Sequence, residues 1–199
     1  QGLTHAIDLV ENLVVRDPDQ TEIRLKLVKI MFERNMIVNV RPHLDALKRQ
    51  RPDEGMVNFY LGWLEERIGQ FSQAVTLYEK ARQQSPKEID IFNRLARVYR
   101  VRLNERTKAD RVMDLPQPAN GMIQNNPTNP RAYLARNLYR REFQLPNPEA
   151  DIEQALQLAP NDLDVLVSAA RESFLGGKPD EARAHLKRAE ELFPENAQV

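Results

Sequence analysis

The sequence predicts an all-α solenoid of antiparallel helix pairs, and regularly spaced prolines are the first observation that predicts it. Six prolines recur at intervals of 34, 34, 41, 33 and 34 residues: Pro18, Pro52, Pro86, Pro127, Pro160 and Pro194. A period between about 20 and 50 residues is typical of repeat architectures, in which each period is one small unit that packs on its neighbours.

Two further sets of residues keep a constant distance from these prolines. Eight positions before a proline the residue is repeatedly large and apolar: Val10, Leu44, Tyr78, Ile152 and Leu186. Seventeen positions before, it is asparagine or glycine in three places: Asn35, Gly69 and Gly177. Asparagine and glycine tolerate the left-handed backbone at which many helices end. Each period therefore predicts two helices with a tight turn between them.

The period that ends at Pro86 shows this pattern most clearly. Apolar residues at helical spacing predict a first helix over 57–68 and a second over 71–84, with a stop between them at Gly69. Gly62 and Ala74 are small enough to let the two backbones approach closely. The next proline cannot supply the backbone donor that would continue the second helix, so it marks the turn to the next pair.

We expect one array, consisting of a half repeat over residues 1–20 and five full repeats. The expected bounds of the five are 21–54, 55–88, 89–129, 130–162 and 163–199. The third has seven extra residues, and its second helix is interrupted at Pro116 and Pro118. We expect either a mobile, recruitable loop over 114–121 or a change of length that the fold simply tolerates. The fourth is expected to shift its register, with Pro148 standing where a small residue belongs. The opening half repeat and the missing initiator methionine suggest a fragment of a larger protein.

Two stretches carry a resemblance to a known family. The motif residues of the first are Phe59-Tyr60-Leu61-Gly62, Gly69-Gln70-Phe71, Ala74, Tyr78, Ala81 and Pro86, and those of the second are Ala170, Gly177 to Ala182, Leu186, Ala189 and Pro194. They resemble the tetratricopeptide repeat (TPR) family, and the resemblance extends over essentially the whole chain. It implies a right-handed α-solenoid, a TPR-like superhelix, that binds other proteins without catalysis. Pentatricopeptide repeats, which read RNA bases, have a similar length, but the prolines, the small-residue pairs and the neutral charge favour TPR.

Composition and motifs point away from an enzyme. The chain has 29 basic and 29 acidic residues and no cysteine, so disulfides, thiolate nucleophiles and cysteine metal sites are excluded. Its three histidines, His5, His43 and His185, fall in separate predicted helices without ligand spacing, and neither a GxSxG elbow nor a glycine-rich phosphate loop is present. We therefore expect no catalytic residue, cofactor or metal. No apolar run is long enough to span a bilayer. Nothing assigns a compartment, and the cytoplasm is the default expectation.

The first helix of each pair is expected to line a concave groove. Eleven positions after successive prolines stand Lys29, Trp63, Arg97 and Arg171, and matching Leu134-Ala135-Arg136 to Leu95-Ala96-Arg97 adds Arg136. Adding aromatic and basic residues one helical turn away gives the predicted partner-binding groove: Lys29, Phe32, Phe59, Trp63, Arg97, Arg100, Arg136, Tyr139, Arg171 and Phe174.

This basic and aromatic groove predicts an acidic or C-terminal peptide segment of another protein as the partner. Residues 94–141 contain eleven Lys or Arg and three Asp or Glu, which would steer an acidic partner to the chain. Periodic arginines that merely solvate a helix face are the structural alternative. The functional alternatives are a nucleic-acid-binding helical repeat, which the neutral net charge disfavours, and the TPR arm of a larger enzyme. A weak homodimer through the N-terminal end is also expected, because Leu3, Val10 or Val14 would be partly uncovered there.

Overall fold

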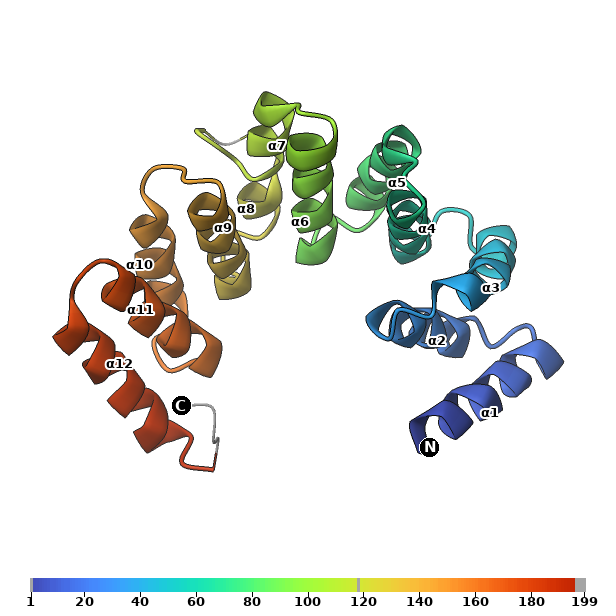
Figure 1. Cartoon of the computed structure of the whole chain (residues 1–199), viewed down its shortest axis with the longest axis horizontal. Helices are drawn as coiled ribbons and strands as arrows, with labels where there is room; N and C mark the ends of the chain where they lie inside the picture. Colours follow the sequence, from blue (N-terminus) through green and yellow to red (C-terminus); the bar gives the residue numbers. More distant parts are fainter. Residues whose placement is uncertain (1, 118, 196–199) are drawn as a thin grey trace. The chain divides into compact units, whose positions relative to one another are not determined.

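The regular structure is entirely helical in the computed structural model, which describes residues 2–117 and 119–195 and, among these, the side chains of all but residues 2, 3, 4 and 6. Figure 1 shows the helices in chain order. They are α1 (Gly2–Arg16), α2 (Thr21–Glu33), α3 (Ile37–Gln50), α4 (Gly55–Arg67), α5 (Phe71–Gln84), α6 (Ile89–Arg97), α7 (Arg106–Val112), α8 (Met122–Asn125), α9 (Pro130–Glu142), α10 (Pro148–Leu158), α11 (Leu163–Leu175) and α12 (Pro179–Leu192). A π-helical turn, η1 (Val98–Arg102), extends α6.

The chain forms two compact units, unit 1 over residues 1–109 and unit 2 over residues 110–199. Within unit 1, α4 and α5 lie side by side as an antiparallel pair, and α11 and α12 do so within unit 2 (Figure 1). This confirms the predicted all-α solenoid of helix pairs.

The prolines set a common frame for these helices. The first helices α2, α4, α6, α9 and α11 all begin three residues after one of the repeating prolines, and all but α6 end fifteen residues after it. The second helices α1, α3, α5, α10 and α12 end two residues before the next proline. We number the residues of each first helix by their distance from the preceding repeating proline, so that +11 is the residue eleven positions after it. Residues with the same number occupy equivalent places in the first helices.

The fourth pair keeps this frame, so the predicted shift of its register is wrong. Its first helix, α9, has the same bounds relative to Pro127 as α11 has to Pro160. The pattern suggests a shift because α9 carries arginine and asparagine at positions where the other first helices are apolar. Pro148, expected to disturb packing, is instead the first residue of α10, where a proline costs no helical hydrogen bond.

The extra residues of the third pair have two locations. The turn residue with positive φ stands seventeen positions after the proline in four pairs, at Asn35, Gly69, Gln144 and Gly177. In the third pair it is Asn104, one position later, because a π-helical turn contains one more residue than an α-helical turn. The others lie between α7 and α8, where the second helix is interrupted as Pro116 predicts; Pro118 is outside the described residues.

The segment between α7 and α8 is anchored at both ends, contrary to the expectation of a recruitable loop. Asp114 is 3% exposed, and its carboxylate accepts hydrogen bonds from the backbone N–H groups of Ala119, Gly121 and Gln124 at 2.7–2.8 Å. Met122 is fully buried beside it. The carboxylate satisfies backbone donors that the broken helix leaves free, so Ala119, Gly121 and Gln124 are held against Asp114.

The N-terminal helix presents different apolar residues from those expected. Val14 is fully buried and Val10 is half-buried, while the side chain of Leu3 is outside the described residues. Among the described side chains of α1, the exposed large apolar residues are Leu9, Leu13 and Val15. A homodimer through this end stays a prediction.

Candidate functional site

Trp63 lies at the centre of an aromatic cluster in unit 1. The rings of Trp63 and Phe32 are stacked, with centroids 4.5 Å apart, and Phe59 lies 5.9 Å from Trp63 on the same helix. Phe32 is 5% exposed and Phe59 is 3% exposed. The prediction that these two phenylalanines offer their rings to a partner is therefore corrected. They are core residues that hold Trp63, which is itself half-buried.

A guanidinium group covers Trp63. The Arg94 Cζ is 3.4 Å from the centroid of the Trp63 ring, and Arg94 Nη1 is 3.3 Å from Glu66 Oε2. Tyr78 donates a hydrogen bond from its hydroxyl to the same carboxylate oxygen at 2.7 Å. Burial, and then the charge of Glu66, raises the pKa of Tyr78, so the hydroxyl keeps the proton that it donates. This arrangement places a cation, a carboxylate and an indole at one point on α4 and α6.

Sequence reasoning placed Arg94 only in the general basic stretch. The signal that could have found it is its spacing, because Arg94 is one helical turn before Arg97 and so lies on the same side of α6. Arg97 is exposed at position +11, and Lys29 is exposed at +11 of α2, 3.9 Å from Glu33. Arg100 is half-buried in the π-helical turn. We call Lys29, Trp63, Arg94 and Arg97 the unit 1 face.

In unit 2, Arg136 is half-buried and its guanidinium group is held by a carboxylate of the same unit, which corrects its predicted place in the groove. It stands at position +9, where the other first helices have Leu27, Leu61, Leu95 and Ala169. Its Nε and Nη2 donate to Asp151 Oδ1 at 2.9 and 2.6 Å, and Arg140 Nε is 3.0 Å from Asp151 Oδ2. Asp151 is 1% exposed. Two arginines of α9 therefore neutralise one buried carboxylate of α10.

Tyr139 is a core residue, at position +12, so its predicted groove role is corrected as well. It is 3% exposed, and its hydroxyl donates to Asp110 Oδ1 at 3.0 Å. Leu138, at position +11 of α9, is exposed. Arg171 at +11 and Phe174 at +14 of α11 are exposed as well. Phe174 is 69% exposed. We call Leu138, Arg171 and Phe174 the unit 2 face.

A second buried carboxylate links α9 to α11. Glu172 accepts hydrogen bonds from Arg141 Nε and from Asn137 Nδ2, both at 3.0 Å. Asn137 Nδ2 also donates to the backbone carbonyl of Pro148 at 2.9 Å. Burial works against the charge of Glu172, but the hydrogen bonds from Arg141 and Asn137 outweigh it and lower the pKa of this carboxyl.

This lowered pKa predicts a loss of stability in acid. An acid whose folded pKa lies below its ordinary value, about 4.5 for Glu172, stabilises the fold above that value and ceases to do so as pH falls through the folded pKa. We expect the difference in unfolding free energy between wild type and Glu172→Gln, measured by urea titration, to shrink steadily below about pH 4.5. Glu190→Gln, on the exposed side of α12, is the control. A wild-type advantage over Glu172→Gln that stays constant from neutral pH to pH 3 would contradict this assignment.

Internal pairing reduces the basic character of residues 94–141. Several of its arginines meet carboxylates from outside the stretch: Arg94 with Glu66, Arg131 with Asp164, Arg136 and Arg140 with Asp151, and Arg141 with Glu172. These carboxylates lie far away in the sequence, so a count along the chain overstates the positive charge that a partner meets.

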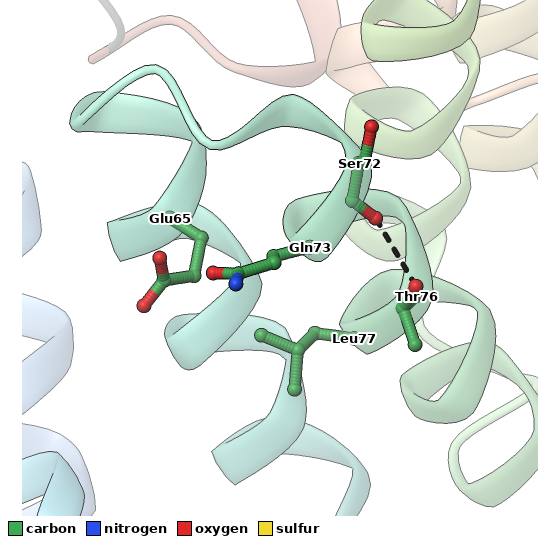
Figure 2. A pocket seen from close by; sticks show the side chains of 5 residues that line it. All are labelled: Glu65, Ser72, Gln73, Thr76 and Leu77. Atoms are coloured by element: carbon green, nitrogen blue, oxygen red, sulfur yellow. Dashed lines mark hydrogen bonds between the residues drawn. The ribbon is translucent and has the colours of Figure 1, made fainter.

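A shallow hollow of about 360 Å³ lies on α4 and α5 in unit 1 (Figure 2). Glu65, Gln73 and Leu77 contribute to its lining, and the amide end of Gln73 points toward the side chain of Glu65. Arg41 of α3 forms an ion pair with Glu65 at 2.9 Å. None of the predicted groove residues lines this hollow.

Within residues 2–117 and 119–195, we find no group of three histidine or acidic side chains placed to hold a metal ion. No helix there is long and apolar enough to cross a membrane.

Comparison with known proteins identifies the repeats. A family model described as tetratricopeptide repeat matches residues 56–98. The human interferon-induced protein with tetratricopeptide repeats 2 is 33% identical over 143 residues, which are 68% of this chain and 29% of the human protein. The chain therefore spans less than a third of the length of this curated relative.

Solved structures of TPR proteins have a similar fold. A thermophilic TPR protein of Thermus thermophilus gives a TM-score of 0.61 at 17% identity, covering 89% of this chain and 94% of that one. YrrB, described as a TPR protein with an unusual peptide-binding site, gives 0.51 at 13% identity, covering 94% and 93%. The pilus biogenesis factor PilW gives 0.58 at 15% identity, covering 87% and 78%. By its repeat sequence and its fold, the chain belongs to the tetratricopeptide-repeat proteins.

Proposed function

We propose that the chain is a non-catalytic protein–protein interaction scaffold whose first-helix face binds an acidic or C-terminal peptide segment of a partner. Its TPR fold supports the general role, since stacked helix pairs present extended surfaces to other proteins. YrrB, which shares the fold, is described as having a peptide-binding site. The acidic nature of the peptide is argued from the residues of this chain.

The arrangement around Trp63 is the observation that carries the proposal. Arg94 is stacked on the indole and is held by one carboxylate, Glu66, while Lys29 and Arg97 add exposed cations at equivalent positions of the neighbouring first helices. A partner carboxylate can join or replace Glu66 at Arg94 without disturbing the stack. The exposed part of Trp63 then contacts apolar atoms of the same peptide.

The unit 2 face has the same mixed chemistry. Leu138 and Phe174 are exposed apolar side chains, and Arg171 is an exposed cation one helical turn before Phe174. Large exposed apolar residues beside a cation fit a segment in which acidic and apolar residues alternate. Each face is proposed as a binding surface in its own unit.

The experiment uses Trp63, which is the single tryptophan of the chain. An octapeptide of glutamate, aspartate and leucine with a free C-terminus is titrated into the protein while Trp63 fluorescence is recorded. The double variant Lys29→Glu/Arg97→Glu is expected to weaken binding by about tenfold or more, since two attractive charges become repulsive. Arg106→Glu/Lys187→Glu makes the same change in net charge at exposed residues that are not part of the unit 1 face, and should change binding by less than about twofold.

Two controls separate the proposal from nucleic-acid binding. Replacing the acidic residues of the octapeptide by glutamine and asparagine should abolish the fluorescence change. A uridine octanucleotide serves as the competing ligand, because contacts to phosphates impose a steep dependence on salt. Tighter binding of the oligonucleotide with such a salt slope would reject the peptide proposal in favour of RNA.

A further inference from the structure

The segment between α7 and α8 contains an asparagine followed directly by a glycine, Asn120 and Gly121, and the sequence has no other such pair. Asparagine is a heat-labile residue, and a following glycine increases this lability because it has no Cβ to hinder its backbone nitrogen. That nitrogen can attack the side-chain amide of the asparagine. Asn120 is exposed to water, whereas Gly121 is buried.

The buried side of this pair is held by Asp114. The Gly121 N–H donates to Asp114 Oδ1 at 2.8 Å, and this carboxylate is 3% exposed. Gly121 also has no free space around it, because a Cβ atom there would lie 2.6 Å from the carbonyl oxygens of Arg111 and Val112. The glycine nitrogen is therefore fixed against the end of α7, and it can move only when a hydrogen bond to a buried carboxylate is broken.

Asn120 is held in a conformation from which the glycine nitrogen cannot reach its side chain. Its φ is 57°, and a residue with this φ commonly has a ψ of about +30 to +60°, which places the next nitrogen on the far side of the Cα–C bond from Cβ. Gln124 Oε1 accepts a hydrogen bond from the Asn120 N–H, and Asn125 Nδ2 donates to the Asn120 backbone oxygen at 3.3 Å. Attack therefore needs the peptide group between Asn120 and Gly121 to turn, which breaks the bond to Asp114.

We propose that Asn120 is a self-modification site, with water as its reactant, and that Asp114 protects it in the folded chain. When the segment opens, the Gly121 nitrogen loses its proton and forms a bond to Asn120 Cγ. The side-chain NH₂ group takes up a proton and leaves as ammonia. Water then opens the resulting succinimide at either of its two carbonyl groups, which gives aspartate or isoaspartate.

The modified segment closes less readily than the original one. The product has a new carboxylate at residue 120, close in the chain to the carboxylate of Asp114, and two like charges repel at short range. In isoaspartate the main chain is also one carbon longer, so the Gly121 N–H no longer lies where Asp114 holds it. The modification thus records that the segment has opened.

The test is peptide mapping by mass spectrometry after incubation in mildly alkaline buffer. Trypsin releases Asn120 in the fragment 112–131, from which the deamidated and isoaspartyl forms are separated and quantified. The folded chain is compared with the chain in guanidinium chloride and with the isolated fragment. Modification is expected to be at least about tenfold slower in the folded chain, because the reaction waits for local opening. Equal rates in all three samples would overturn the protection, and no modification in the unfolded chain would overturn the site.

Variants assign the protection to Asp114. Asp114→Asn removes the negative charge that holds the backbone donors and should speed the modification of Asn120 in the folded chain by about fivefold or more. Asp180→Asn makes the same charge change at an exposed residue and should leave the rate unchanged. Far-UV circular dichroism of each variant shows that the rate is measured on folded protein.

A second variant covers the case in which Asp114→Asn does not fold. Gln124→Ala replaces an exposed side chain and removes the acceptor of the Asn120 N–H, so it should also speed the modification. An unchanged rate in folded Asp114→Asn, or in Gln124→Ala where the former does not fold, would refute the proposed protection.

Discussion

Replacing Asp151 by alanine is expected to lower the unfolding free energy by about 3–5 kcal/mol, since it removes one side of a buried ion pair. Asp151 is 1% exposed and receives Arg136 and Arg140 from the facing helix. Without the carboxylate, two guanidinium groups would remain at the interface of α9 and α10 without the buried charge that pairs with them. Urea unfolding followed by far-UV circular dichroism measures the loss.

Two further variants make the result specific to burial. Asp180→Ala removes the partner of Arg183 from an exposed pair and should cause no measurable change. Arg136→Met/Arg140→Met/Asp151→Leu replaces all three charges by apolar groups and should recover most of the stability lost in Asp151→Ala, because no charge is then left unpaired. A loss below about 1 kcal/mol in Asp151→Ala would show that water reaches these arginines.

Replacing Gly62 by valine is the second large effect, with an expected loss of about 3 kcal/mol from overpacking. A Cβ atom at Gly62 would lie 2.8 Å from two ring carbons of Tyr78 and 3.2 Å from the carbonyl oxygen of Ala74. Tyr78 is fully buried and its hydroxyl is bound to Glu66, so the ring has no free space to move into. The helices α4 and α5 would have to separate.

The matched control for this effect is Gly176→Val. A Cβ at Gly176 would meet its nearest neighbours, two carbonyl oxygens, at 3.4 and 3.5 Å, and the residue is exposed. Thermal unfolding of the two variants should therefore give a clearly lower melting temperature for Gly62→Val alone. Equal melting temperatures would mean that the α4 and α5 contact adapts to a larger residue.

Most of the fold could be predicted because local signals and distant packing agree. The prolines, the positive-φ turn residues Asn35, Gly69 and Gly177, and the small residues at Gly62 and Ala74 each serve one structural need that repeats along the chain. The π-helical turn has no such signal. Its single extra residue is hidden in a longer insertion, which the sequence alone presents as a loop.

The candidate site was harder to predict because the role of an arginine depends on its partners. Arg136 fits a basic ladder by composition, but its partner Asp151 belongs to the next helix and is invisible to any local pattern. Counting from Pro127 would have placed Arg136 at +9 and Leu138 at +11. Conversely, the sequence could not separate the buried Phe32 and Phe59 from exposed residues, because an aromatic ring at helical spacing suits both a groove and a core.

This distinction determines which substitutions can test binding. Reversing Arg136 to glutamate would place two carboxylates together in the interior and unfold this part of unit 2, so a loss of binding would say nothing about a peptide site. Lys29, Arg97 and Arg171 are exposed, and their reversal leaves the buried pairs intact.

The most direct test of the proposed function is the affinity of the acidic octapeptide for wild type, for Lys29→Glu/Arg97→Glu and for the charge-matched Arg106→Glu/Lys187→Glu, read from Trp63 fluorescence in one buffer. The proposal predicts a loss of about tenfold or more in the first double variant and less than about twofold in the second. Equal affinities in all three proteins would contradict an acidic-peptide site on the unit 1 face.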